Sequence, residues 1–450
     1  TLDGFRALLE ERVHLAAPLR ERLVEVPLGL GSPYWVEDPD FDIEYHTREV
    51  ALCPPGTAEQ LGEQVARIHA RPLDRSRPLW EMYLVHGLEG GRVALYSKVH
   101  HAAIDGISGA EILATVLDVT VEPREVEPAG AWSPAPLPDS RVLLLRGVAS
   151  SALRARELVT SLPRSLPHLA DLPGAKNVPG IGLISGIADV LVAVATGSDS
   201  GRLADGRDLT VPHTPFNGTI TAHRRFSYGS VPLADVKAVK NAFGLTVNDV
   251  VMAMATTALR RWLLDHDALP TIPLVAAVPV SVRGDDEQGE LGNLLSVMLT
   301  SLPTDVADPA ERLRAVAEAT AEAKRQFEAV PASILQDLSA AVPTALSGLA
   351  TRALFKLATV PGPPLNLFVS NVPGPQLPLY VAGALVEGIY PVSALTDMTG
   401  GMNITLFSYD GSLDFGVVVC REMVPDVWKL IGYLAEALDE LLALAAQIRD

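Results

Sequence analysis

Apolar and polar positions along the chain follow two periods, which predict a mixture of strands and helices. Short apolar runs with alternating or continuous burial are typical of strands, and apolar positions three and four apart are typical of amphipathic helices. Strands are predicted at residues 92–100, 272–280, 293–300, 365–370, 382–390, 402–407 and 413–419. Helices are predicted at residues 57–70, 108–117, 231–243, 246–265, 309–327, 332–358 and 425–448. Thr57 and Gln60 have the spacing of a capping box at the start of the first of these helices.

The order of these elements indicates the fold class and the domain organisation. Strands and helices mix without strict βαβ alternation, which favours an α+β fold with mixed sheets. A chain of 450 residues is too long for one ordinary core, so two domains are expected. Residues 121–140 are rich in Pro, Glu and Ala, as in a linker. We therefore predict an N-terminal domain at 1–120, a linker region at 121–209 and a C-terminal domain at 210–450.

Composition narrows the classes of function. Hydrophobic residues make up 48% of the chain and charged residues 20%, as in a globular protein with an ample core. The net charge of −18 argues against nucleic-acid binding, which needs a basic surface. The chain has 2 cysteines, without metal or redox spacing, so neither a metal site nor a disulfide framework is predicted.

A basic segment interrupts this acidic chain. Residues 141–176 carry six basic and two acidic side chains, a local net charge of 6 − 2 = +4, with apolar clusters between them. Such a stretch either docks on a lipid surface or forms an inter-domain helix with a solvated face. The following low-charge run at 180–197 is barely long enough to cross a bilayer and contains Asp189, so a buried or interfacial segment is expected there.

The candidate chemistry lies in two adjacent histidines, His100 and His101, at the end of the predicted strand 92–100. Adjacent side chains on a strand point to opposite faces, so one imidazole can face a cavity while the other is held in its wall. That arrangement suits a lone base better than a two-histidine metal site. Asp105 can fix the turn that follows by pairing with an arginine, and Gly106 permits close backbone approach or a positive φ.

The imidazole is expected to act directly on a substrate. Imidazole titrates near neutral pH and can take a proton from an alcohol or thiol. The chain has no Gly-x-Ser-x-Gly nucleophile elbow, and Cys53 and Cys420 lie far from His101 in sequence. The alternative is a hydrogen-bonded core histidine without a chemical role.

The segment 100–106, His-His-Ala-Ala-Ile-Asp-Gly, matches the HHxxxDG motif of the CoA-dependent acyltransferase superfamily, which includes chloramphenicol acetyltransferase, the plant BAHD enzymes and peptide-synthetase condensation domains. Five further segments, in family order, make the chain resemble the bacterial wax ester synthase/diacylglycerol acyltransferase family more closely. They are Pro-Leu-Trp-Glu at 78–81, Gly-Leu-Thr-Val-Asn-Asp-Val-Val at 244–251, Pro-Val-Ser-Val-Arg at 279–283, Phe-Val-Ser-Asn-Val-Pro-Gly-Pro at 368–375 and Gly-Met-Asn-Ile-Thr-Leu-Phe-Ser-Tyr at 401–409.

This resemblance implies a fold and a set of roles. It implies two chloramphenicol-acetyltransferase-like mixed-sheet sandwich domains, with an active-site tunnel between them and His101 near its middle. His101 would be the general base and His100 mainly structural. Asp105 would orient the loop through Arg283, or Arg283 would simply face solvent. Gly106 would be a backbone requirement, as would Gly374 in the segment 368–375.

Other residues keep two interpretations each. Asn248 either caps its helix or donates to the developing oxyanion and shapes the acceptor channel. Asn371 precedes Val-Pro-Gly-Pro, where a turn role is expected. Trp80 is either a packed aromatic or a weak candidate for substrate binding. Possible partners for CoA phosphates, or simply solvated surface charges, are Arg224, Arg225, Lys237, Lys240, Arg260 and Arg261.

The resemblance also implies the reaction. We expect an O-acyltransferase that moves a long-chain acyl group from acyl-CoA directly to a diacylglycerol or fatty alcohol, without a cofactor. The alternatives are condensation-like transfer to another acceptor and a lipid-binding protein with a vestigial site. The expected location is cytoplasmic, peripheral at the inner face of the cell membrane or at lipid droplets.

Overall fold

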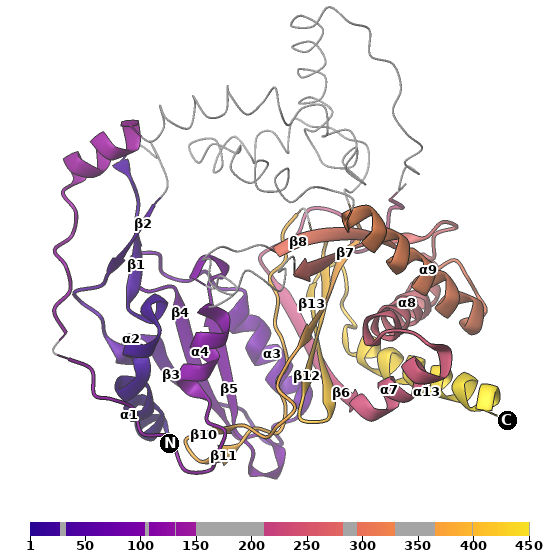
Figure 1. Ribbon diagram of the computed structural model, residues 1–450, viewed down its shortest axis with the longest axis horizontal. Coiled ribbons are helices and arrows are strands. Elements are labelled where there is room, and N and C mark those ends of the chain that lie inside the picture. Colours follow the sequence, from indigo (N-terminus) through magenta and orange to yellow (C-terminus); the bar gives the residue numbers. More distant parts are fainter. Residues whose placement is uncertain are drawn as a thin grey trace, which may run out of the picture.

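The computed structural model describes residues 1–27, 33–103, 108–130, 132–149, 211–281, 295–328, 365–397 and 399–449 (Figure 1). The N-terminal elements form a three-stranded sheet with helices on both faces. The C-terminal elements form a larger sheet covered by helices. Both sheets mix parallel and antiparallel pairs, which confirms the α+β prediction.

The N-terminal sheet has the order β3-β4-β5. Its strands are β3 (Thr47–Ala51), β4 (Trp80–His86) and β5 (Ala94–Val99); β3 and β4 pair in parallel, β4 and β5 antiparallel. Helices α1 (Leu2–Arg12) and α4 (Ser108–Val116) pack with Trp80 and Met82 on one face. Helix α3 (Ala58–His69) packs with Tyr83 and Tyr96 on the other.

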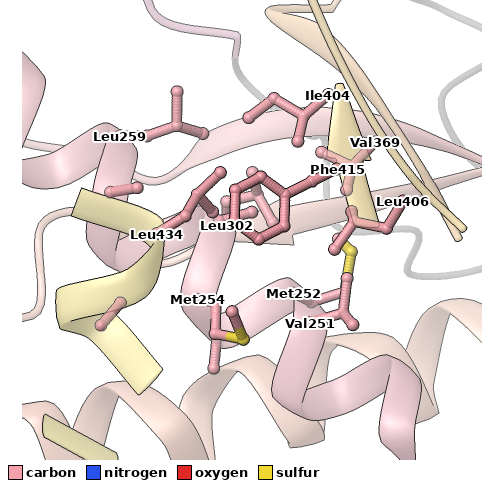
Figure 2. Packing of buried hydrophobic residues seen from close by; sticks show 14 of the residues in the cluster. Val251, Met252, Met254, Leu259, Leu302, Val369, Ile404, Leu406, Phe415 and Leu434 are labelled. Atoms are coloured by element: carbon pink, nitrogen blue, oxygen red, sulfur yellow. The ribbon is translucent and has the colours of Figure 1, made fainter. Parts of the chain in front are cut away.

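The C-terminal sheet has the order β6-β13-β12-β9-β7-β8. Its strands are β6 (Arg224–Pro232), β7 (Leu274–Ser281), β8 (Leu295–Leu302), β9 (Leu367–Pro373), β12 (Met402–Tyr409) and β13 (Ser412–Cys420). Its helices are α7 (Leu233–Phe243), α8 (Val247–Asp265), α9 (Pro309–Glu328) and α13 (Trp428–Arg449). Figure 2 shows the main core, in which α8 packs Val251, Met252 and Leu259 against Leu406 and Phe415 of the sheet.

Smaller elements complete the described chain. The short strands are β1 (Glu21–Val24), β2 (Tyr34–Glu37), β10 (Tyr380–Val381) and β11 (Ala384–Leu385). The short helical turns are α2 (Ile43–His46), η1 (Val13–Leu15), η2 (Ala17–Leu19), η4 (Glu89–Gly91) and η5 (His101–Ala103). Strands β1 and β2 form one antiparallel ribbon, and β10 and β11 another.

Helix α3 joins the two sheets, because it packs both on its own sheet and on β6 of the other. Leu61 and Val65 of α3 lie in one buried cluster with Phe226 of β6 and Val418 of β13. Gly62 permits this close approach: a Cβ at that position would lie 2.5 Å from the carbonyl oxygen of Phe226. The capping box of Thr57 and Gln60 is confirmed and fixes where α3 begins.

Two predicted elements are wrong in extent. The predicted strand 382–390 is reduced to β11, because Ala382 and Gly383 have φ of 48° and 81° and form the tight turn after β10. The predicted helix 231–243 begins only at Leu233, since β6, which the pattern did not reveal, continues to Pro232. The predicted helix 332–358 and the low-charge run 180–197 lie outside the described residues.

Within the described ranges, no single helix has both the length and the apolar character needed to cross a membrane. Helices α7 and α8 pass that test only as a pair, and they are bent by 103° to one another. The N-terminal two-thirds of α8 is buried in the main core, so its apolar character is accounted for by packing.

Candidate functional site

The histidine pair stands immediately beyond the end of β5. The strand ends at Val99, the backbone N–H of His100 donates to the carbonyl oxygen of Leu79 at 2.9 Å, and His101 opens the turn η5. The expectation that strand alternation sends the two rings to opposite faces is therefore wrong, because the pair lies in a turn. Both side chains are exposed.

His100 has a role in the geometry of this turn. Its Nδ1 accepts the backbone N–H of Ala102 at 3.1 Å, which holds the chain around His101. Partial burial, followed by the charges of Arg75 and His101, lowers the pKa of His100 below its ordinary value. The neutral ring with a free Nδ1 lone pair is the form that this hydrogen bond needs, which agrees with a structural role for His100.

His101 is exposed, so the interpretation as a buried core histidine is wrong. Its ring forms no hydrogen bond to any residue in the described part of the chain. No described residue therefore occupies either ring nitrogen of His101. Asp105, Gly106 and Arg283, the residues predicted to orient it, lie outside the described residues, and their roles stay predictions.

Asn248 does not cap its helix. The N-cap of α8 is Thr246, whose Oγ1 accepts the N–H of Asp249 at 3.2 Å, while Asp249 Oδ2 accepts the N–H of Thr246 at 2.9 Å. Thr320 Oγ1 of α9 donates to the other carboxylate oxygen of Asp249 at 2.6 Å. Asn248 is partly exposed beside this fixed helix start, and its amide forms no hydrogen bond within the described chain. Its role as a donor to the oxyanion or in shaping the acceptor channel stays a prediction.

The segment around Asn371 is a strand with a tight exit. Asn371 lies inside β9, paired with Leu406 of β12, so the predicted turn role is wrong. Gly374 follows the end of β9, where a Cβ would lie 2.3 Å from the carbonyl oxygen of Ser408 and 2.4 Å from the ring of Phe407. The backbone requirement at Gly374 is confirmed, and its cause is close packing against β12.

Trp80 is a packed aromatic residue, as one of the two interpretations predicted. Its side chain is buried, Nε1 donates to the carbonyl oxygen of Leu19 at 2.9 Å, and the ring stacks on His46 at 4.4 Å. With only 1% of its surface exposed, Trp80 offers no contact to a substrate. The candidate role in substrate binding is wrong.

Three of the six candidate phosphate ligands already have partners in the protein. Arg224 donates to the carbonyl oxygens of Thr221 and His223. Arg260 donates to Thr304 O at 2.6 Å, and Arg261 pairs with Glu436 at 2.6 Å. Arg225 is exposed on β6. The side chains of Arg225, Lys237 and Lys240 form no hydrogen bond or ion pair in the described residues, so their role as phosphate ligands stays a prediction.

The sequence did not single out the polar contacts between β5 and the end of α3. Lys98 of β5 donates to the carbonyl oxygen of Ile68 at 3.0 Å and also to that of Arg71, which ties the histidine-bearing strand to the end of α3. His69 Nδ1 lies 3.0 Å from Tyr96 Oη. Lys98 is adjacent to the HHxxxDG segment, and that proximity was the only signal available.

Acidification is expected to destabilise the protein through His69. Burial, with the charges of Lys98 and Arg224, lowers the pKa of His69 to about 4. In the unfolded chain, His69 therefore binds a proton once the pH falls below about 6.5. In the folded chain, His69 binds that proton only near pH 4. The free energy of unfolding should fall by up to roughly 3 kcal/mol between these pH values.

Chemical denaturation of the protein and of His69→Gln at pH 7 and pH 5 measures this effect. The variant should lose stability at pH 7 but show a flatter dependence on pH. A residual slope is expected from His46, whose pKa burial also lowers. An unchanged slope in the variant would contradict the assignment to His69.

The fold and the open histidine turn define a class, the two-sheet acyltransferases that carry HHxxxDG. The family model described as "Wax ester synthase/diacylglycerol acyltransferase catalytic domain" matches residues 1–251, and "WS/DGAT C-terminal domain" matches residues 291–442. The chain belongs to the wax ester synthase/diacylglycerol acyltransferase (WS/DGAT) family and is an acyltransferase of that type.

Individual relatives agree with this assignment. The putative diacylglycerol O-acyltransferase Rv1760 of Mycobacterium tuberculosis is 36% identical, over 98% of this chain and 83% of the relative. The putative diacylglycerol O-acyltransferase Rv3740c of the same organism is 38% identical over 98% of this chain and 90% of the relative. The solved structure of the wax ester synthase/diacylglycerol acyltransferase from Marinobacter aquaeolei VT8 superposes with a TM-score of 0.68 and 31% identity, covering 99% of this chain and 90% of that one.

Proposed function

We propose that this protein transfers a long-chain acyl group from acyl-CoA to the hydroxyl group of a diacylglycerol or fatty alcohol, with His101 as general base. The observation that carries the proposal is the exposed ring of His101 at the start of η5, without a hydrogen bond in the described chain. An exposed imidazole that is held in a fixed turn can reach a hydroxyl proton directly. The relatives named as diacylglycerol O-acyltransferases support the choice of acceptor.

The reaction needs a base and an oxyanion donor. His101 takes the proton of the acceptor hydroxyl while the oxygen attacks the thioester carbonyl carbon, which gives a tetrahedral oxyanion. The carbon–sulfur bond then breaks, and the CoA thiolate receives the proton from His101. The partly exposed amide of Asn248, at the capped start of α8, is proposed to donate to the oxyanion or to line the acceptor channel. Both substrates are bound together, and no acyl-enzyme forms.

The test is a competition assay with purified protein and palmitoyl-CoA. Hexadecanol and a diacylglycerol are offered together, and the wax ester, triacylglycerol and free CoA are resolved by chromatography. We expect one molecule of free CoA to be released for each molecule of wax ester or triacylglycerol formed. Saturable lipid binding without release of CoA, a kinetically competent covalent acyl-enzyme, or a requirement for a carrier-protein thioester would each contradict the proposal.

We further propose that the protein works as a peripheral protein at the cytoplasmic face of a membrane or at lipid droplets. The helix at 140–149 supports this, since Val142, Leu145 and Val148 are 43%, 72% and 52% exposed beside Arg141 and Arg146. Apolar side chains flanked by arginines suit an anionic lipid surface. Flotation with anionic vesicles should carry the protein upward, and Leu145→Asp should reduce that binding. Equal flotation of the variant would contradict this role for the helix.

A further inference from the structure

A cleft of about 330 Å³ lies on the α3 side of the N-terminal sheet, at its β3 edge. Its polar lining is drawn from four parts of the chain: β3, α3, the loop after α3, and β4. The side chains that matter for recognition are those of Arg48, Glu49, Gln64, Arg71, Glu81 and Tyr83. This volume suits a small charged group or part of a larger ligand.

The carboxylates of the cleft lie beside other polar side chains of the protein. Glu81 Oε2 accepts the hydroxyl hydrogen of Tyr83 at 2.7 Å. Glu49 Oε1 lies 2.6 Å from Nε2 of His86, without the geometry of a hydrogen bond.

Three donor groups of the cleft have no hydrogen-bond acceptor in the described part of the protein, and one of these groups, on Arg71, is exposed to solvent. Nη1 of Arg48 is buried without a hydrogen bond, and it forms an ion pair with Glu81 Oε1 at 3.5 Å. The guanidinium of Arg71 and the amide of Gln64 form no hydrogen bond or ion pair within the described ranges. An excess of open donors calls for a ligand rich in acceptor oxygens. The two guanidinium groups of the cleft can donate to an anionic ligand.

The cleft is connected to the histidine pair through the backbone. Lys98 donates to the carbonyl oxygen of Arg71, and it lies opposite Glu81 in the β4–β5 pair. His100 follows two residues later, at about 7 Å along an extended chain. The loop 71–79 also carries Arg75, whose charge contributes to the lowered pKa of His100. The histidine pair thus follows a strand position that contacts the cleft-lining residue Arg71.

We propose that this Arg48–Arg71 cleft binds a phosphate group of the acyl-CoA donor. The assignment rests on the proposed function, because it needs acyl-CoA as the donor. The pantetheine arm of CoA separates its phosphates from the thioester, so a phosphate can be bound in a cleft beside the site while the carbonyl carbon reaches His101. The paired arginines supply bidentate, charge-assisted hydrogen bonds, which neutral parts of the donor cannot match.

The primary test measures the binding of free CoA by calorimetry, which needs no turnover. Arg71→Gln is expected to weaken CoA binding about tenfold, since one charge-assisted hydrogen bond is lost. Arg67→Gln is the matched control: Arg67 is on α3 and pairs with Glu63 on the exposed surface, outside the cleft. Arg48→Gln is a second cleft variant, and circular dichroism confirms that each variant is folded. Equal CoA affinity in Arg71→Gln and Arg67→Gln would overturn the assignment.

A second measurement identifies the phosphate. With palmitoyl-CoA, Arg71→Gln should raise KM about tenfold and leave kcat nearly unchanged, because the phosphate is distant from the reacting bond. Palmitoyl-pantetheine lacks phosphate. With this thioester, Arg71→Gln and the unsubstituted protein should have the same KM. An equal rise in KM for both thioesters would overturn the proposal, as would Arg71-dependent binding to phosphatidic acid vesicles without any effect on CoA.

The two proposals fail in different ways. If the protein binds CoA through Arg71 but transfers no acyl group to either acceptor, the proposed function is wrong while the cleft assignment stands. If His101→Ala abolishes transfer and Arg71→Gln binds CoA normally, the function stands and the cleft assignment is wrong.

Discussion

Replacement of His101 by alanine should lower the rate of acyl transfer by about 10²–10⁴-fold, the usual cost of removing a general base. The side chain is exposed and forms no hydrogen bond in the described part of the chain, so its loss leaves no buried group without a partner. The folded structure and the affinity for CoA should therefore be retained. The measurements are the release of CoA in the presence of an acceptor, and thermal unfolding.

Variants at the neighbouring histidine provide the control. His100→Asn keeps an acceptor near the position of Nδ1 for the N–H of Ala102, so it should retain most of the activity. His100→Ala loses that acceptor and should lose more, through disorder in the turn. A folded His101→Ala protein with near-normal turnover would exclude His101 as the base. Equal losses of activity in His100→Asn and His101→Ala would contradict the assignment of a structural role to His100 and a catalytic role to His101.

Replacement of Asp118 by alanine should lower the free energy of unfolding by about 3–5 kcal/mol, because it leaves Arg12 as a buried charge without an opposite charge beside it. Nη1 of Arg12 lies 3.0 Å from Asp118 Oδ2, and the two side chains are 0% and 1% exposed. Asp118 also forms a backbone bridge with Tyr380, so it links the N-terminal elements to the β10–β11 ribbon. Urea denaturation measures the loss.

A surface pair on α3 provides the matched comparison. Glu63→Ala breaks the exposed ion pair with Arg67 and should cost less than about 1 kcal/mol. The double variant Arg12→Met, Asp118→Leu removes both buried charges and should recover much of the stability lost in Asp118→Ala. A loss below about 1 kcal/mol in Asp118→Ala would show that solvent reaches Arg12.

Local pattern predicted the four helices of the C-terminal sheet and all its strands except β6, because their signals are local, but it did not predict α1, β3 or β4. The capping box of Thr57 and Gln60 spans three residues, and the apolar repeat of α8 spans its whole length. The pattern failed at 382–390, where apolar residues alternate as in a strand. There the backbone turns at Ala382 and Gly383 and then leaves the ribbon, and Ile389 N–H donates to Asp414 Oδ2 at 2.8 Å. That carboxylate is distant in sequence, so no local period could indicate it.

The same limit applies to individual side chains. Asn248 and Thr246 are both good N-cap residues, and only the backbone geometry selected Thr246. The alternation argument for His100 and His101 assumed that β5 continued through them, whereas the strand ends at Val99. A shift of one or two residues in an element boundary was enough to change the surroundings of each ring.

The sequence by itself determined the chemistry: the HHxxxDG segment, its ordered companion segments and the mixed order of strands and helices indicated the family and the fold class. Tertiary structure alone decided which polar groups are satisfied. It buried Trp80 in a core, gave Glu81 and Glu49 their partners, and left Arg48 and Arg71 with open donors in one cleft. The physical reason is that chemical identity belongs to each residue, whereas burial and pairing depend on segments that meet only when the chain is folded.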